Sequence, residues 1–133
     1  MKNVMSAYIG GLLGFLILDG LWLGLIAKDS YTQAMAGLMR SEVHIWPWVV
    51  FYSLYCLAIV QLVIRPQFSA RQGKGVLLNG AVLGAAAYGA YNMTNYALLA
   101  DWPLGISLQD WAWGTVVTSF SSYCGWRAQR LAS

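Results

Sequence analysis

The chain has 133 residues, of which 59% belong to the hydrophobic set AVILMFWYC and only 10% are charged. An average soluble domain has about 25% charged residues, so this composition excludes a soluble globular domain, and the high hydrophobicity also excludes a disordered chain. The net charge of +3 comes from basic residues that flank apolar segments. This placement indicates membrane topology and not nucleic-acid binding.

Four apolar segments are each long enough to cross a bilayer as a helix, which needs about 20 mostly apolar residues. In chain order they span residues 7–27, 45–64, 76–99 and 108–126. Backbone groups in lipid must form their hydrogen bonds within the segment. We therefore predict an all-α, polytopic membrane protein, a bundle of four transmembrane helices in a single domain that covers residues 1–133.

The segment between the first two spans predicts a short helix. Ser30 and Gln33 have the spacing of a capping box, with Ser30 as the N-cap. Apolar side chains then recur at intervals of one helical face: Tyr31, Met35, Leu38 and Met39. We expect a short amphipathic helix at the membrane interface in this first outer loop.

Glycine pairs with a spacing of four residues predict close helix packing. The pairs are Gly10 and Gly14, Gly20 and Gly24, and Gly80 and Gly84. From these pairs we expect the first and third spans to pack against each other. A hinge or a ligand groove is the functional alternative.

The loop charges predict the orientation of the chain. Six basic residues and no acid lie in the N-terminal segment, the loop of residues 65–75 and the C-terminal segment: Lys2, Arg65, Arg71, Lys74, Arg127 and Arg130. The opposite side carries only Lys28 and Arg40 as basic residues, beside three acids. By the positive-inside rule, we expect both termini to be cytoplasmic.

Polar residues gather in the half of the spans that lies farthest from the termini. Asp19 interrupts the first span, and an acid within a membrane indicates a functional site, with a buried clamp between helices as the alternative. On the third span, Tyr88, Asn92 and Asn95 recur at i, i+4 and i+7 on one helix face, which Tyr91 borders. We expect these side chains to face Asp19 in the bundle interior. A hydrogen-bond ladder between helices is the alternative for the amides.

Asp110 begins the fourth span and has two interpretations. Ser107 to Asp110 form a capping-box pattern with Ser107 as the N-cap, so the carboxylate could complement the helix N-terminus. Asp110 also shares a helix face with Trp113, as Asp19 does with Trp22. We therefore include both acids and both tryptophans in the candidate site.

Several short motifs together resemble one known family. They are LDGLWLG at 18–24, YNMTN at 91–95, WPL at 102–104 and DWAWGT at 110–115. The combination is similar to a four-span bacterial inner-membrane family that is catalogued as a domain of unknown function (DUF2177). The resemblance implies location in the bacterial inner (cytoplasmic) membrane and a polar set of Asp19, Trp22, Tyr91, Thr94, Asn95, Asp110 and Trp113.

The resemblance implies no established reaction. The resemblance also implies a genomic neighbourhood with fatty-acyl-modifying enzymes such as cyclopropane synthases, and this neighbourhood favours a lipid-like ligand. At Asn92 the family pattern has Asp or Asn, so the resemblance does not require a carboxylate at that position.

Three functions are compatible with the sequence. The first is a polar pocket in the outer-leaflet half of the bundle that binds, or as an enzyme modifies, a lipid-like or other amphiphilic molecule, with Asp19 and Asp110 as acid–base or orienting groups. The second is a non-enzymatic subunit that assembles with a larger membrane complex or with itself. The third is a small proton-coupled carrier that uses Asp19. The candidate ligand-binding residues are Asp19, Trp22, Tyr88, Tyr91, Asn92, Thr94, Asn95, Asp110 and Trp113.

One histidine and two cysteines do not make a His/Cys metal site, and the sequence has no P-loop, dinucleotide-binding glycine motif or HExxH motif. We therefore predict no metal site of this kind and assign no cofactor.

Overall fold

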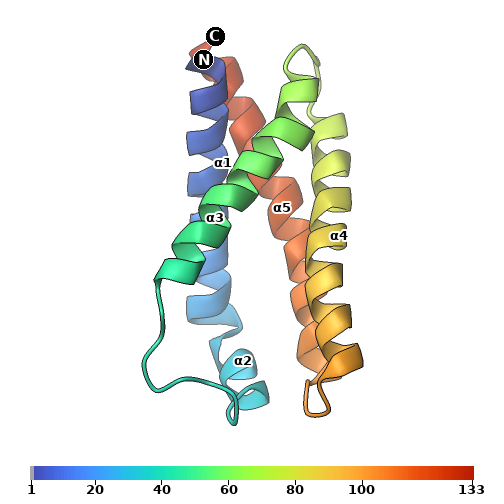
Figure 1. Ribbon diagram of the computed structural model, residues 1–133. Coiled ribbons are helices and arrows are strands. Elements are labelled where there is room, and N and C mark those ends of the chain that lie inside the picture. Colours follow the sequence, from blue (N-terminus) through green and yellow to red (C-terminus); the bar gives the residue numbers. More distant parts are fainter. Residues whose placement is uncertain (1) are drawn as a thin grey trace.

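The computed structural model describes residues 2–133 as an all-α structure (Figure 1). In chain order its elements are α1 (Lys2–Leu21), the π-helical turn η1 (Trp22–Ile26), α2 (Lys28–Ala34), α3 (Trp46–Ile59), the π-helical turn η2 (Val60–Ile64), the 3-10 turn η3 (Arg65–Gln67), α4 (Lys74–Leu98) and α5 (Leu104–Ala132). Both termini lie at one end of the molecule, and α2 lies at the other (Figure 1).

Each predicted span corresponds to a long helix. By length and hydropathy, two of these helices are apolar enough to cross a membrane, Lys2–Ile26 and Trp46–Gln67. Helices α4 and α5 have 25 and 29 residues, which is sufficient length, but they carry more polar side chains. The all-α prediction is confirmed.

Helix α5 lies between α1 and α4 and packs against both (Figure 1). A Cβ atom on Gly10 would lie 2.5 Å from the Cβ of Ala128, and one on Gly84 would lie 2.5 Å from the carbonyl oxygen of Gly114. The expectation that the first and third spans pack against each other is therefore wrong. Each uses its glycine pair against the fourth span, because α5 has small residues on two faces.

The third glycine pair has a different environment. A Cβ atom on Gly20 or Gly24 would have no neighbour within 4 Å among residues 2–133. These two glycines flank the start of η1, where the carbonyl of Trp22 accepts a hydrogen bond from the backbone N–H of Ala27 at 2.7 Å. They are therefore not contacts between helices.

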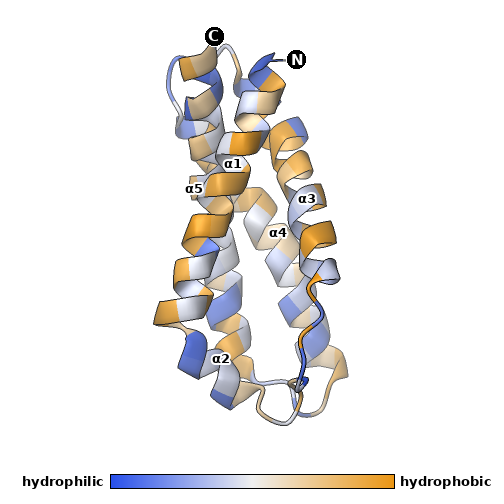
Figure 2. Cartoon of the chain, turned by 90° about the vertical axis from the view of Figure 1, so that its left-hand side faces the viewer, coloured by the Kyte–Doolittle hydropathy of each residue, from blue (hydrophilic) through white to orange (hydrophobic). Residues whose placement is uncertain are grey.

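The distribution of polarity suits a surface in lipid. Large apolar side chains project outward on every long helix: Leu25, Leu54, Leu78 and Val82 are 62–77% exposed, and Val116 is 57% exposed. Figure 2 shows hydrophobic segments along much of α1 and α3. The buried polar residues are Asp19, Asn92, Ser107, Thr118, Ser121, Ser122 and Gln129. An exposed apolar surface over a partly polar interior is unfavourable in water and favourable in a bilayer.

Helix α3 crosses α1 obliquely (Figure 1). Its continuation is buried among the other helices through Val60, Val63 and Ile64. Its first turns, from Trp46 to Leu54, are mostly exposed. Because only one end of α3 is packed closely, its other end is free to border a cavity with α4.

Both capping-box predictions are wrong. Helix α2 begins at Lys28 with Ala27 as its N-cap, and α5 begins at Leu104 with Pro103 as its N-cap. The backbone N–H of Ser107 already donates to the carbonyl of Pro103, and so does its hydroxyl, at 2.6 Å. Ser107 therefore lies within the helix and does not cap it.

Candidate functional site

Asp19 lies in the last turns of α1 and is 6% exposed. One carboxylate oxygen accepts a hydrogen bond from the hydroxyl of Tyr52 on α3. The other accepts one from Nε1 of Trp113 on α5, at 2.9 Å. The carboxylate thus joins three helices.

Asp110 lies on α5 and also uses both of its oxygens. Oδ1 accepts a hydrogen bond from the hydroxyl of Tyr31 on α2 at 2.6 Å, and Oδ2 accepts one from Nδ2 of Asn92 on α4 at 2.8 Å. Asn92 is 1% exposed and also donates to the carbonyl of Tyr88 at 2.9 Å. The observed role of Asp110 is therefore to join α2, α4 and α5, and not to complement the N-terminus of α5.

Two tryptophans connect the carboxylates. The rings of Trp22 and Trp113 stack with centroids 4.5 Å apart and planes 7° from parallel. Nε1 of Trp22 donates to the hydroxyl oxygen of Tyr31 at 3.2 Å. We define the polar network as Asp19, Trp22, Tyr31, Tyr52, Asn92, Asp110 and Trp113, which come from α1, η1, α2, α3, α4 and α5.

Tyr31 is the member of the polar network that α2 contributes. Burial, together with its hydrogen bond to Asp110, raises the pKa of this phenol well above its usual value. The hydroxyl therefore remains protonated at neutral pH and donates to the carboxylate.

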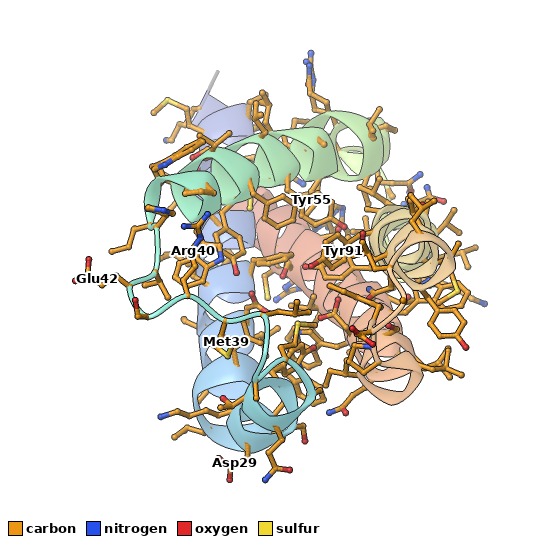
Figure 3. The ribbon with its side chains drawn as sticks, turned by 60° about the horizontal axis from the view of Figure 1, so that its bottom comes forward. Asp29, Met39, Arg40, Glu42, Tyr55 and Tyr91 are labelled. Atoms are coloured by element: carbon orange, nitrogen blue, oxygen red, sulfur yellow. The ribbon has the colours of Figure 1, made fainter. Side chains whose placement is uncertain are left out.

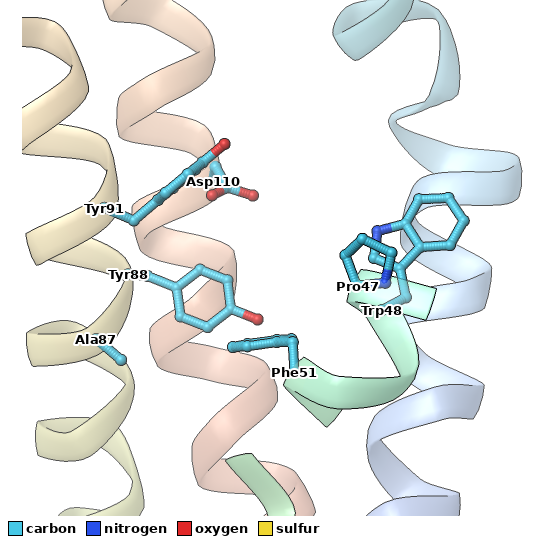
Figure 4. A pocket seen from close by; sticks show the side chains of 7 residues that line it. All are labelled: Pro47, Trp48, Phe51, Ala87, Tyr88, Tyr91 and Asp110. Atoms are coloured by element: carbon cyan, nitrogen blue, oxygen red, sulfur yellow. The ribbon is translucent and has the colours of Figure 1, made fainter. Parts of the chain in front are cut away.

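Two adjoining cavities lie beside the polar network. The apolar compartment, of about 360 Å³, is lined by Pro47, Trp48, Phe51, Ala87, Tyr88, Tyr91 and Asp110 (Figure 4). The polar compartment, of about 290 Å³, is lined by Asp19, Leu23, Tyr31, Met35, Trp48, Phe51, Tyr52, Tyr88, Tyr91, Asn92, Ile106 and Asp110. Together they have the volume of a pocket for a small molecule.

The walls of the apolar compartment come from α3 and α4, with one residue from α5. Figure 4 shows Tyr88 reaching from α4 toward Phe51 of α3, and Tyr91 lying beside Asp110, which projects from α5. Trp48 lies on the other side of the space. Seen from the α2 end, Tyr91 and Tyr55 lie in the space between α3 and α4 (Figure 3). Tyr88 packs on Gly114, where a Cβ atom would collide with its ring.

The structure brings seven of the nine candidate residues together. Five line the polar compartment, namely Asp19, Tyr88, Tyr91, Asn92 and Asp110, and Trp22 and Trp113 belong to the polar network. Thr94 is exposed on another side of α4. Asn95 is half-buried one turn beyond Asn92, and in the described chain neither side chain joins the polar network. Thr94 lies apart because its side chain is on another side of α4, and Asn95 because it lies one turn nearer the end of the helix.

Two residues of the polar network are not among the nine candidates. The residue spacing places Tyr31 on the apolar face of an interfacial helix, but its hydroxyl faces Asp110. No motif in the sequence includes Tyr52. A phenol within an apolar span requires a hydrogen-bond partner, and this requirement was the available signal for Tyr52.

The family comparison covers the whole of this site. A family model described as "Predicted membrane protein (DUF2177)" matches residues 4–127. No curated protein and no solved structure matches the chain. The matched range contains every residue of the polar network and of both compartments.

Proposed function

The chain belongs to the DUF2177 family of predicted membrane proteins, as its motifs indicated, and on this premise we propose that it binds an amphiphilic small molecule within the membrane. In this proposal α1, α3, α4 and α5 all cross the bacterial inner membrane. Both termini and the loop of residues 65–75, which together carry six basic residues, then face the cytoplasm. The two compartments lie in the outer-leaflet half of the bundle.

The observation that carries the proposal is the junction between the two compartments. One has walls of Pro47, Trp48, Phe51 and Ala87, and the other contains both carboxylates. They share Asp110 and the aromatic residues Trp48, Phe51, Tyr88 and Tyr91. A molecule with an apolar chain and a polar head group fits this division, since each part meets a surface of its own polarity.

The position of α3 supports access from the side. Trp48, Phe51 and Tyr91 line both compartments and are 50%, 42% and 54% exposed. They therefore form a rim that a lipid-like molecule in the bilayer reaches without crossing water. The polar head then meets Asp110 of α5, which lies beside Tyr91 of α4.

The hydrogen bonds support binding as the role of the carboxylates. All four carboxylate oxygens of Asp19 and Asp110 accept hydrogen bonds from the protein. Such groups are held in one orientation, as is required for positioning a ligand. We propose an orienting role for both.

The test is retention of a natural amphiphile, with one variant that fills the pocket and one that does not. Ala87 lines the apolar compartment, whereas Ala86 is exposed on the same helix. The wild type, Ala87→Phe and Ala86→Phe are purified in mild detergent, and the bound molecules are measured by native mass spectrometry and by solvent extraction.

We expect the wild type and Ala86→Phe to retain the same amphiphile in near-stoichiometric amount, and Ala87→Phe to lose most of it. Equal retention by Ala87→Phe, or no bound amphiphile in the wild type, would overturn the proposal. The native mass also shows whether the chain is a monomer or part of a larger assembly, which tests the subunit alternative.

A further inference from the structure

The two acids of the site have no basic partner among residues 2–133. Asp19 and Asp110 line the polar compartment, and no Lys, Arg or His is among the side chains that line either compartment. Within residues 2–133, all hydrogen bonds to these carboxylates come from neutral groups, namely Tyr, Trp and Asn.

Neutral donors stabilise a carboxylate without cancelling its charge. Four such donors converge on the four oxygens, one on each, and none of them carries a positive charge. A carboxylate inside an apolar bundle is costly unless a positive charge lies nearby. Because residues 2–133 supply none among the lining side chains, we look to a bound ligand for it.

The aromatic walls favour a particular kind of positive charge. Both compartments are lined by Asp110 and by the same four aromatic residues, namely Trp48, Phe51, Tyr88 and Tyr91. The negative face of an aromatic ring attracts an ammonium group, and a carboxylate beside several rings is a suitable surface for one. Each carboxylate oxygen also keeps a lone pair for an ammonium N–H.

We propose that the head group of the ligand is an ammonium, so that the pocket selects a long-chain or lipid-linked amine and rejects a phosphate, sulfate or carboxylate head. This inference rests on the proposed function because it requires the pocket to bind an amphiphile. The apolar compartment holds the chain, and the ammonium lies between Asp110 and Asp19.

The test compares amphiphiles that differ only in the head group. Dodecylamine, dodecanol and dodecanoic acid are titrated at neutral pH into the protein in a neutral maltoside detergent, and binding is measured by calorimetry. The pocket-filling variant Ala87→Phe is the blank, because the signal that a compound gives with it reports partition of that compound into the micelle. Asp110→Asn removes one charge at the same shape, and Asp29→Asn is the matched control because Asp29 projects outward from α2 (Figure 3).

We expect dodecylamine to bind the wild type at least tenfold more tightly than dodecanol does. Dodecanoic acid should give the same binding signal with the wild type as with Ala87→Phe. Asp110→Asn should abolish the preference for the amine, and Asp29→Asn should retain it. The comparison of ligands on the wild type needs no variant, so it stands even if Asp110→Asn does not fold.

The outcomes separate the two proposals. Equal affinity for the amine and the alcohol, or preference for the acid, overturns the ammonium inference and leaves the amphiphile pocket in place. Binding of no compound beyond the level of Ala87→Phe overturns both.

Discussion

Trp22 and Trp113 stack face to face, with ring centroids 4.5 Å apart. Their indole N–H groups donate to different members of the polar network. Trp113 donates directly to Asp19, whereas Trp22 donates to Tyr31, which in turn donates to Asp110. The stacked pair therefore connects the hydrogen bonds of Asp19 with those of Asp110, although the two acids lie on different helices.

The contact between Trp113 and Asp19 predicts energetic coupling. Trp113→Phe removes the N–H donor and keeps a ring for stacking on Trp22, and Asp19→Asn removes the charge of the acceptor. A double-mutant cycle should give a coupling energy of about 1 kcal/mol, in the range of hydrogen bonds between membrane helices. The free energy of unfolding in mixed micelles measures it. Combining Trp113→Phe with the exposed Asp29→Asn should be additive, and additivity with Asp19→Asn would contradict the prediction.

The raised pKa of Tyr31 predicts a dependence of stability on alkaline pH. Folding favours the protonated phenol because burial and the hydrogen bond to Asp110 disfavour its anion. The stabilisation by Tyr31 is therefore complete below about pH 10, the usual pKa of tyrosine, and is lost as the pH rises toward the folded pKa. The difference in unfolding free energy between the wild type and Tyr31→Phe should decrease above about pH 10. A constant difference would show that this phenol does not ionise on unfolding.

Two glycine substitutions should have opposite effects on stability. A Cβ atom at Gly84 would lie 2.5 Å from the carbonyl oxygen of Gly114, so Gly84→Ala requires α4 and α5 to separate, at a cost of about 1–3 kcal/mol. Gly20→Ala meets nothing within 4 Å and should be neutral or stabilising by up to about 1 kcal/mol, through helix propensity. Thermal unfolding in detergent measures both. A stable Gly84→Ala variant would contradict the close packing of α4 on α5.

The loop charges predict one orientation for the proposed four crossings. Single cysteines at Ser133 and at Asp101, in a background without Cys56 and Cys124, are tested with a thiol reagent that does not cross the inner membrane. We expect the reagent to label position 101 and not position 133. Labelling of position 133 alone would show the opposite orientation, with the two compartments in the cytoplasmic half of the membrane.

Some features of the site follow from residue order alone. Hydropathy located the long helices, and the spacing of Tyr88 and Asn92 placed them on one face of α4, because helical periodicity depends only on sequence. The cost of an acid in an apolar segment identified Asp19 as a residue that needs partners. The motifs around Asp19 and Asp110 were sufficient to indicate the family that the comparison shows.

Other features depend on which helices meet, and they result from the packing of the folded chain. Gly10 and Gly84 pack on α5 and not on each other, and Asp19 is bonded to Tyr52 and Trp113 and not to Asn95. Residue spacing determines the faces of a single helix, but the rotation and partners of that helix result from packing among all of them. For this reason the sequence determined the helices and their polar faces, whereas tertiary packing determined the partners of each carboxylate and the shape of the cavity between α3 and α4.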